Sequence, residues 1–116
     1  MKKIKINEIK VFTDEWIGYL IYCSPNEGQQ VIKKMFPEVS PKFENSRGLT
    51  FTNSTKVPAI WINSELVKTE KLKLLVLIHE SYHLIKHIGE NINIEDDEWF
   101  AETLEWVVKQ GIKILK

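Results

Sequence analysis

Five residues of this chain, His79-Glu80-Ser81-Tyr82-His83, have the types and spacing needed for metal-assisted hydrolysis. Two histidines four positions apart on a helix share one face, so both imidazoles are able to bind the same zinc ion. The carboxylate that follows the first histidine is then placed to deprotonate a metal-bound water. The pattern H-E-x-x-H therefore indicates a zinc site with His79 and His83 as ligands and Glu80 as general base.

The helix that must carry this motif is apolar on almost every side. Between Leu72 and Ile85 the apolar residues are distributed all round a helix at ~100° per residue, which predicts a central, buried helix. Thr69 is its expected N-cap and Gly89 its expected end. The alternative is an exposed helix that happens to carry two histidines. Burial favours the zinc site, because buried imidazole and carboxylate groups need partners.

A catalytic zinc site needs a third protein ligand, and His87 is too far away to supply it. His79 and His87 are eight residues apart, which is ~12 Å along a helix axis. Each imidazole nitrogen must lie ~2 Å from the ion. The expected source of the third ligand is therefore a carboxylate on the next predicted helix, which runs from about Glu95 to near Lys113.

This next helix begins with several acidic residues, and its apolar face ranks them. The predicted apolar stripe consists of Ala101, Leu104, Val108, Ile112 and Leu115. Glu98 lies on the same face one turn earlier and has a longer reach than Asp97, so Glu98 is the expected ligand. Asp97 is ranked second and Glu102 third. The competing explanation is a solvated helix start that complements the helix dipole, and it accounts for Glu95 and Asp96.

The first third of the chain predicts two strands and a helix. Residues 3–12 form an expected edge strand or ordered arm, and residues 16–23 form an expected strand. Ser24 and Glu27 have the spacing of a capping box around a helix start. Pro37 is expected to end this helix.

Residues 49–52 and 57–63 predict a hairpin that precedes the motif helix. Pro58 lacks a backbone N–H, which places the second strand at a sheet edge. We therefore expect residues 1–116 to form a single α+β domain. It would have a short mixed or antiparallel sheet, an amino-side helix, a central active-site helix and a carboxyl-terminal helix, with the helices on one face of the sheet.

Composition excludes several classes of partner. The 16 basic and 16 acidic side chains cancel, and Arg47 is the only arginine, which disfavours nucleic acid and anionic membranes. No apolar run approaches the ~20 residues needed to span a bilayer. Cys23 is the only cysteine, which favours a reducing compartment, and the first residues lack the apolar core of a signal peptide. We expect a cytoplasmic protein; the sequence predicts no oligomeric state.

Three segments carry a resemblance to a known family. They are Ala59-Ile60-Trp61-Ile62, the H-E-x-x-H motif at 79–83, and Asp97-Glu98-Trp99-Phe100-Ala101. Over about residues 49–108 the chain resembles gluzincin metallopeptidases, in particular the minigluzincins and small zincin-like proteins of phages and prophages. It is more loosely similar to ImmA/IrrE-type peptidases, which act on repressor proteins. The E-A-N segment usual in that group is missing here.

The resemblance implies a zinc metallopeptidase that acts on a protein or peptide substrate. It implies His79, His83 and Glu98 as zinc ligands and Glu80 as base. It also implies that the strand at residues 57–63 pairs with substrate as an added strand, with Ile60 and Trp61 in contact with it. The alternative is that Ile60, Trp61 and Ile62 are only the core and surface of a hairpin.

A second function class remains open. A zincin-like phage or prophage protein could serve as a non-catalytic binding or regulatory factor, with a structural or vestigial metal site. The presence of Glu80 favours the enzyme, because a purely structural zinc site has no need of a base.

Overall fold

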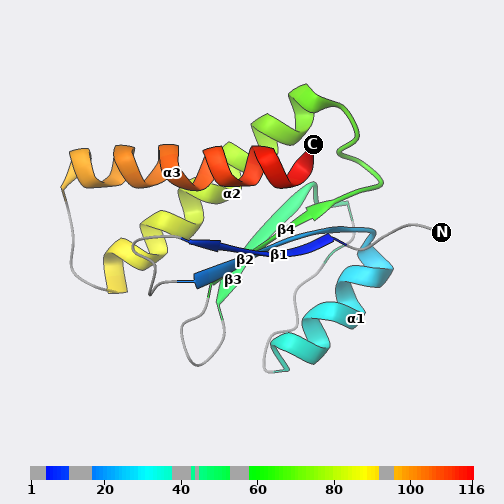
Figure 1. Ribbon diagram of the computed structural model, residues 1–116. Coiled ribbons are helices and arrows are strands. Elements are labelled where there is room, and N and C mark those ends of the chain that lie inside the picture. The colour runs from blue at the N-terminus through cyan, green and yellow to red at the C-terminus, as the bar shows by residue number, and fades with distance from the viewer. Residues whose placement is uncertain (1–4, 11–16, 38–42, 44, 53–57, 92–95) are drawn as a thin grey trace.

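The computed structural model describes residues 5–10, 17–37, 43, 45–52, 58–91 and 96–116. The fold is α+β, as predicted, and these described residues form a four-stranded mixed sheet and three helices (Figure 1). Its elements are β1 (Lys5–Lys10), β2 (Ile17–Cys23), α1 (Pro25–Met35), β3 (Gly48–Thr52), β4 (Pro58–Asn63), α2 (Glu70–Asn91) and α3 (Asp97–Leu115). None of the helices in the described part of the chain is long and apolar enough to cross a membrane.

The strand order is β1-β2-β4-β3, so β4 lies inside the sheet. It pairs in parallel with β2 and antiparallel with β3. The expectation that residues 57–63 form an edge strand is therefore wrong, and β1 and β3 are the edges. Pro58 is tolerated because it is the first residue of β4, and pairing with β2 begins one residue later at Ala59.

Helices cover both faces of the sheet (Figure 1). The carboxyl-terminal helices α2 and α3 lie on one face and α1 lies on the other, so the expectation that the helices share one face is wrong for α1. Strand β4 alternates between these layers: Ile60 and Ile62 join the core under α2 and α3, whereas Trp61 joins the core over α1. A strand buried on both faces belongs at the centre of a sheet.

Helix α1 begins as its sequence predicts. The Ser24 side chain accepts a hydrogen bond from the Glu27 backbone N–H at 3.2 Å, and the Glu27 carboxylate accepts one from the Ser24 N–H at 3.2 Å. This capping box satisfies two backbone donors that a helix start otherwise leaves unpaired.

Helix α2 starts where expected but is less buried than expected. The Thr69 hydroxyl accepts a hydrogen bond from the Leu72 N–H at 3.1 Å, as an N-cap does. Gly89 does not end the helix, which continues to Asn91. Leu75 and Tyr82 are 52% and 44% exposed, so the prediction of a helix buried on almost every side is wrong. Among the described elements, the main contacts of α2 are with one sheet face, at β3 and β4, and with one helix, α3.

Helix α3 begins at Asp97, with Asp96 as its N-cap. The buried residues of α3 are shifted by about one position from the predicted apolar stripe; they are Thr103, Val107, Gly111 and Leu115. Gly111 explains part of this shift, because a Cβ there would lie 2.7 Å from both terminal methyl groups of Leu77 on α2. The neighbouring Gln110 links α3 to β1: its amide bonds both backbone groups of Lys10, with the Lys10 N–H donating at 2.9 Å and the Lys10 C=O accepting at 2.6 Å.

Candidate metal and catalytic site

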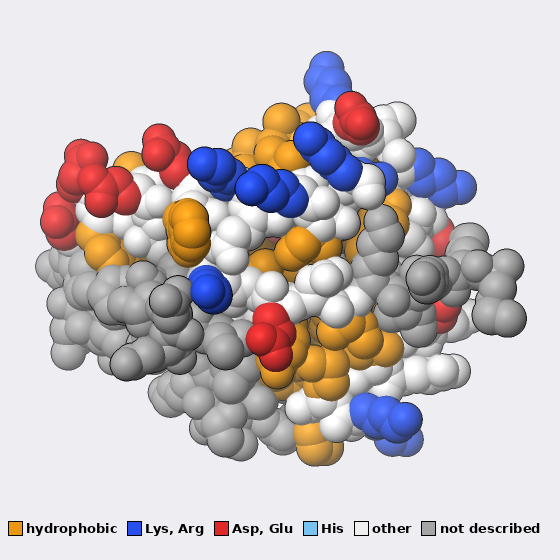
Figure 2. Space-filling view, in the orientation of Figure 1, with side chains coloured by type: hydrophobic (Ala, Val, Ile, Leu, Met, Phe, Trp, Pro, Cys, Tyr) orange, Lys and Arg blue, Asp and Glu red, His pale blue; other side chains and the backbone are white. Residues whose placement is uncertain are grey.

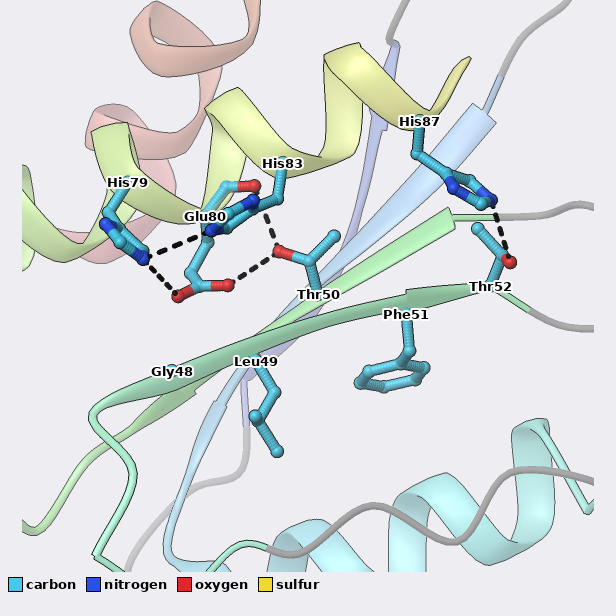
Figure 3. A pocket seen from close by; sticks show the side chains of 9 residues that line it. All are labelled: Gly48, Leu49, Thr50, Phe51, Thr52, His79, Glu80, His83 and His87. Carbon is cyan, nitrogen blue, oxygen red and sulfur yellow. Dashed lines mark hydrogen bonds and ion pairs between the residues drawn. The ribbon is translucent and has the colours of Figure 1, made fainter. Parts of the chain in front are cut away.

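His79 and His83 leave α2 on the side that faces β3 (Figure 3). Their Nε2 atoms lie 3.3 Å apart, and the ring planes meet at 79°. Two nitrogens bound to one tetrahedral zinc at ~2.0–2.1 Å are separated by ~3.3–3.4 Å. The two imidazoles therefore already have the spacing that a shared zinc ion requires.

The Glu80 carboxylate is held beside this histidine pair by the edge strand. The Thr50 hydroxyl lies 2.7 Å from Glu80 Oε1 and 2.9 Å from the Glu80 backbone carbonyl oxygen, and both atoms are acceptors. The other carboxylate oxygen lies 3.8 Å from His79 Nε2. Glu80 is only 6% exposed, so one donor from Thr50 decides much of its orientation. Sequence reasoning missed Thr50, because 30 residues separate it from Glu80.

Gly48 allows α2 to approach the edge strand this closely. A Cβ at Gly48 would lie 3.0 Å from Glu80 Cγ, 2.9 Å from Val76 Cγ1 and 3.1 Å from the Trp61 carbonyl oxygen. Contacts of this length are tighter than ordinary van der Waals packing. Because Trp61 belongs to the central strand, only α2 or β3 is able to yield to a larger side chain.

Two adjoining pockets lie between β3 and α2, beside the histidine pair. One has a volume of about 560 Å³, and the second shares Gly48, His79 and Glu80 with it. We call the two together the α2–β3 groove. It is lined by Asn45, Ser46, Arg47, Gly48, Leu49, Thr50, Phe51 and Thr52 on one side, and by Leu75, Val76, His79, Glu80, His83 and His87 on the other.

Along this groove, strand β3 directs some of its backbone N–H and C=O groups outward, away from its neighbour β4. The Asn63 N–H donates to the Arg47 carbonyl at 2.9 Å, which makes the adjacent residues Gly48 and Ile62 a non-hydrogen-bonded antiparallel pair. Non-hydrogen-bonded and hydrogen-bonded pairs alternate along an antiparallel ladder. Gly48, Thr50 and Thr52 therefore direct their backbone N–H and C=O groups to the edge of β3 that has no strand partner among the described residues.

His87 lies at one end of the groove. Its Nε2 atom is 3.3 Å from the Thr52 hydroxyl oxygen. Figure 3 shows His87 with Thr52, apart from the pair formed by His79 and His83. The sequence-based exclusion of His87 as a ligand of the same ion agrees with this placement.

The structure does not bring Glu98 to the histidine pair. Among the residues it describes, no histidine, cysteine or carboxylate group of three or more is arranged to hold a metal ion. Glu98, Asp97 and Glu102 are all exposed, and Figure 2 shows acidic side chains gathered at the beginning of α3. Phe100, which packs on Tyr82 of α2, is ~200° round the helix from Glu98. Glu95 lies outside the described residues.

Ile60 and Trp61 are not substrate-binding residues in this structure. Both are fully buried, at 0% exposure, in the central strand. Each packs in one of the two cores. The prediction for this pair is wrong because it depended on β4 being an edge strand, and β3 occupies that position instead.

Cys23 is no candidate nucleophile. It is 2% exposed in the core that lies against α1. Burial raises the pKa of its thiol to about 11, so the reactive thiolate is scarce at neutral pH.

Comparisons with protein families, with curated proteins and with solved structures gave no match for this chain. Functional inference therefore depends on the chemistry of the groove itself.

Proposed function

We propose that this protein is a zinc-dependent peptidase in which His79 and His83 bind the metal and Glu80 is the general base. The observation that carries the proposal is the 3.3 Å separation of the two Nε2 atoms, which suits one tetrahedral zinc ion. The buried Glu80 carboxylate beside them supplies the base that hydrolysis requires.

Bound zinc would lower the pKa of a water ligand to ~7 and polarise the substrate carbonyl. Glu80 accepts a proton from the attacking water and then donates it to the nitrogen of the leaving amine. Thr50 holds one carboxylate oxygen, so the other oxygen stays turned toward His79. This arrangement orients the base before substrate arrives, which lowers the entropic cost of the reaction.

The groove suits an extended peptide. From Leu75 to His87 it follows thirteen residues of α2. The twelve steps between them span ~18 Å of helix, which is the length of five to six extended residues at ~3.3 Å each. A peptide that pairs with Gly48, Thr50 and Thr52 would extend the sheet by one strand. Backbone pairing of this kind supplies affinity with little demand on sequence.

Glu98 stays our predicted third ligand, although a ligand role requires the first turn of α3 to change its position relative to α2. Zinc titration of three variants, Glu98→Gln, Asp97→Asn and Glu102→Gln, tests the ranking. A large loss of zinc affinity in Glu98→Gln alone would identify this ligand. Unchanged affinity in all three variants would remove α3 from the metal site.

The alternative is a non-catalytic binding or regulatory protein, and one observation favours it: the described residues include no complete three-ligand group. Metal analysis and casein hydrolysis, with and without chelator, distinguish the two functions. We expect Glu80→Gln to keep zinc and lose cleavage, and His83→Ala to lose both. Glu90→Gln, which changes an exposed carboxylate on the same helix, is the matched control. Wild-type cleavage by Glu80→Gln would refute the proposed mechanism.

A further inference from the structure

Arg47 lies at the end of the α2–β3 groove opposite to His87. It is the only arginine in the chain, and it lines the part of the groove that includes Leu75 and Val76. The residue is exposed, and no described acidic side chain forms an ion pair with its guanidinium group. A guanidinium presents a fixed fork of donors that fits a carboxylate.

The backbone around Arg47 is anchored by a buried side chain. Asn63, which is 2% exposed, donates from Nδ2 to the Ser46 carbonyl at 3.0 Å and from its backbone N–H to the Arg47 carbonyl at 2.9 Å. The Asn63 side-chain oxygen accepts a third bond, from the Glu65 N–H at 2.9 Å. These contacts fix the Arg47 backbone at the wall of the groove, and the Arg47 side chain is exposed.

The charge of the groove is suited to an anionic group at this end. Among the described residues that line it, Glu80 is the only acidic one, and one of its oxygens is already bound by Thr50. Arg47 precedes Thr50 by three residues, which is ~10 Å along a strand. A peptide paired with β3 and cut beside Glu80 would therefore place a residue two or three positions from the scissile bond within reach of Arg47.

We propose that Arg47 is a specificity-determining residue that selects peptides with a carboxylate two or three positions from the scissile bond. The carboxylate comes from an aspartate or glutamate side chain, or from the carboxyl terminus of the peptide. This inference rests on the proposed peptidase function and names its substrate class. Bidentate pairing with the guanidinium supplies the selectivity, and a neutral amide of the same shape does not reproduce it.

The test measures binding separately from cleavage. Fluorescein-labelled nonapeptides with amidated ends carry glutamate, glutamine or lysine at each position in turn, and a second set has no acidic side chain but a free carboxyl terminus. Fluorescence anisotropy measures their binding to Glu80→Gln protein, alone and combined with Arg47→Gln, Arg47→Lys or Arg47→Glu. Lys71→Gln, which removes an exposed positive charge from α2 outside the groove lining, is the control. Wild-type protein is assayed in parallel for hydrolysis of the same peptides.

We expect a carboxylate at one position to tighten binding about 10-fold or more, as a charge-assisted pair does. Arg47→Gln should abolish that preference, Arg47→Lys should weaken it, and Arg47→Glu should transfer it to lysine-containing peptides. The two peptide sets show whether the side chain or the terminus supplies the carboxylate.

Several results would overturn the inference. A carboxylate preference that survives in Arg47→Gln would do so, as would efficient hydrolysis without any carboxylate preference, although the latter would leave the peptidase function intact. Failure to bind any peptide would refute both. An Arg47-dependent preference without hydrolysis by zinc-loaded wild-type protein would support the role of Arg47 and refute the peptidase.

Discussion

Replacement of Thr50 by valine tests whether the edge strand orients the general base. Valine keeps the shape of threonine but removes the hydroxyl that lies 2.7 Å from Glu80 Oε1. Glu80 is 6% exposed, so water replaces the lost donor poorly. A hydrogen bond to a charged group contributes ~1.5–3 kcal/mol. If this contribution acts through the orientation of the base, kcat/KM should fall ~10–100-fold, since each ~1.4 kcal/mol is a factor of ten.

The assay is steady-state cleavage of a peptide substrate, with zinc content measured on the same samples. Thr50→Ser keeps the hydroxyl and should remain close to wild type. Thr52→Val removes a hydroxyl from the same face of the same strand, where it contacts His87 instead of Glu80, and should also have little effect. The loss in Thr50→Val should appear in kcat, because the backbone that pairs with substrate is unchanged.

Two results would refute this explanation. One is a wild-type kcat in Thr50→Val with zinc fully bound. The other is a loss in Thr50→Ser as large as that in Thr50→Val, which would point to the γ-methyl group and not to the hydroxyl. Thermal unfolding of each variant shows whether a low rate reflects loss of folded protein, and the kinetics are measured well below the unfolding midpoint.

Three further predictions concern packing and pH. Gly48→Ala should force β3 and α2 apart and lower the free energy of unfolding by ~1–3 kcal/mol. It should also lower activity, because Glu80 is displaced. Urea titration measures the stability and a cleavage assay the activity, and a variant as stable and active as wild type would contradict the close approach. Ser81→Ala should preserve activity and raise the free energy of unfolding by ~1 kcal/mol. The reason is that the buried Ser81 hydroxyl has no hydrogen-bond partner in the described structure. A lower free energy of unfolding for the variant, measured by urea titration, would contradict the prediction. Burial raises the pKa of the Cys23 thiol to about 11 from its ordinary 9.0. The unfolded chain therefore releases the thiol proton at lower pH than the folded chain, and the free energy of unfolding should fall as pH rises from about 9 to 11. Cys23→Ala should show a smaller fall in its urea midpoint over this range, and an equal fall would exclude the thiol as the cause.

Short-range chemistry made several features predictable from sequence. The capping box of Ser24 and Glu27 and the N-cap at Thr69 depend on residues three positions apart, and the structure contains both. The convergence of His79 and His83 follows from helix periodicity in the same way. Each of these predictions required only the geometry of a single helix.

Features that depend on long-range packing were not predictable in the same way. Pro58 has the same sequence signature at an edge strand and at the first position of a central strand, and only the pairing order β1-β2-β4-β3 decides between them. Gly111 has no apolar side chain, yet the close approach of Leu77 places it in the core and shifts the buried line of α3. The contact between Thr50 and Glu80 has no local signal, because it joins a strand to a helix.

The amide of Gln110 makes the two edges of the sheet unequal. It occupies the backbone N–H and C=O of Lys10, the groups that a further strand would need at the carboxyl end of β1. Helix α3 thereby blocks strand addition at this point, whereas β3 keeps its outward backbone groups beside the groove. Edge-to-edge pairing of two folded copies would therefore meet less obstruction at β3 than at this end of β1. For the proposed peptidase, a high protein concentration would then act as competitive inhibition, because a neighbouring copy and a substrate would pair with the same backbone groups of β3.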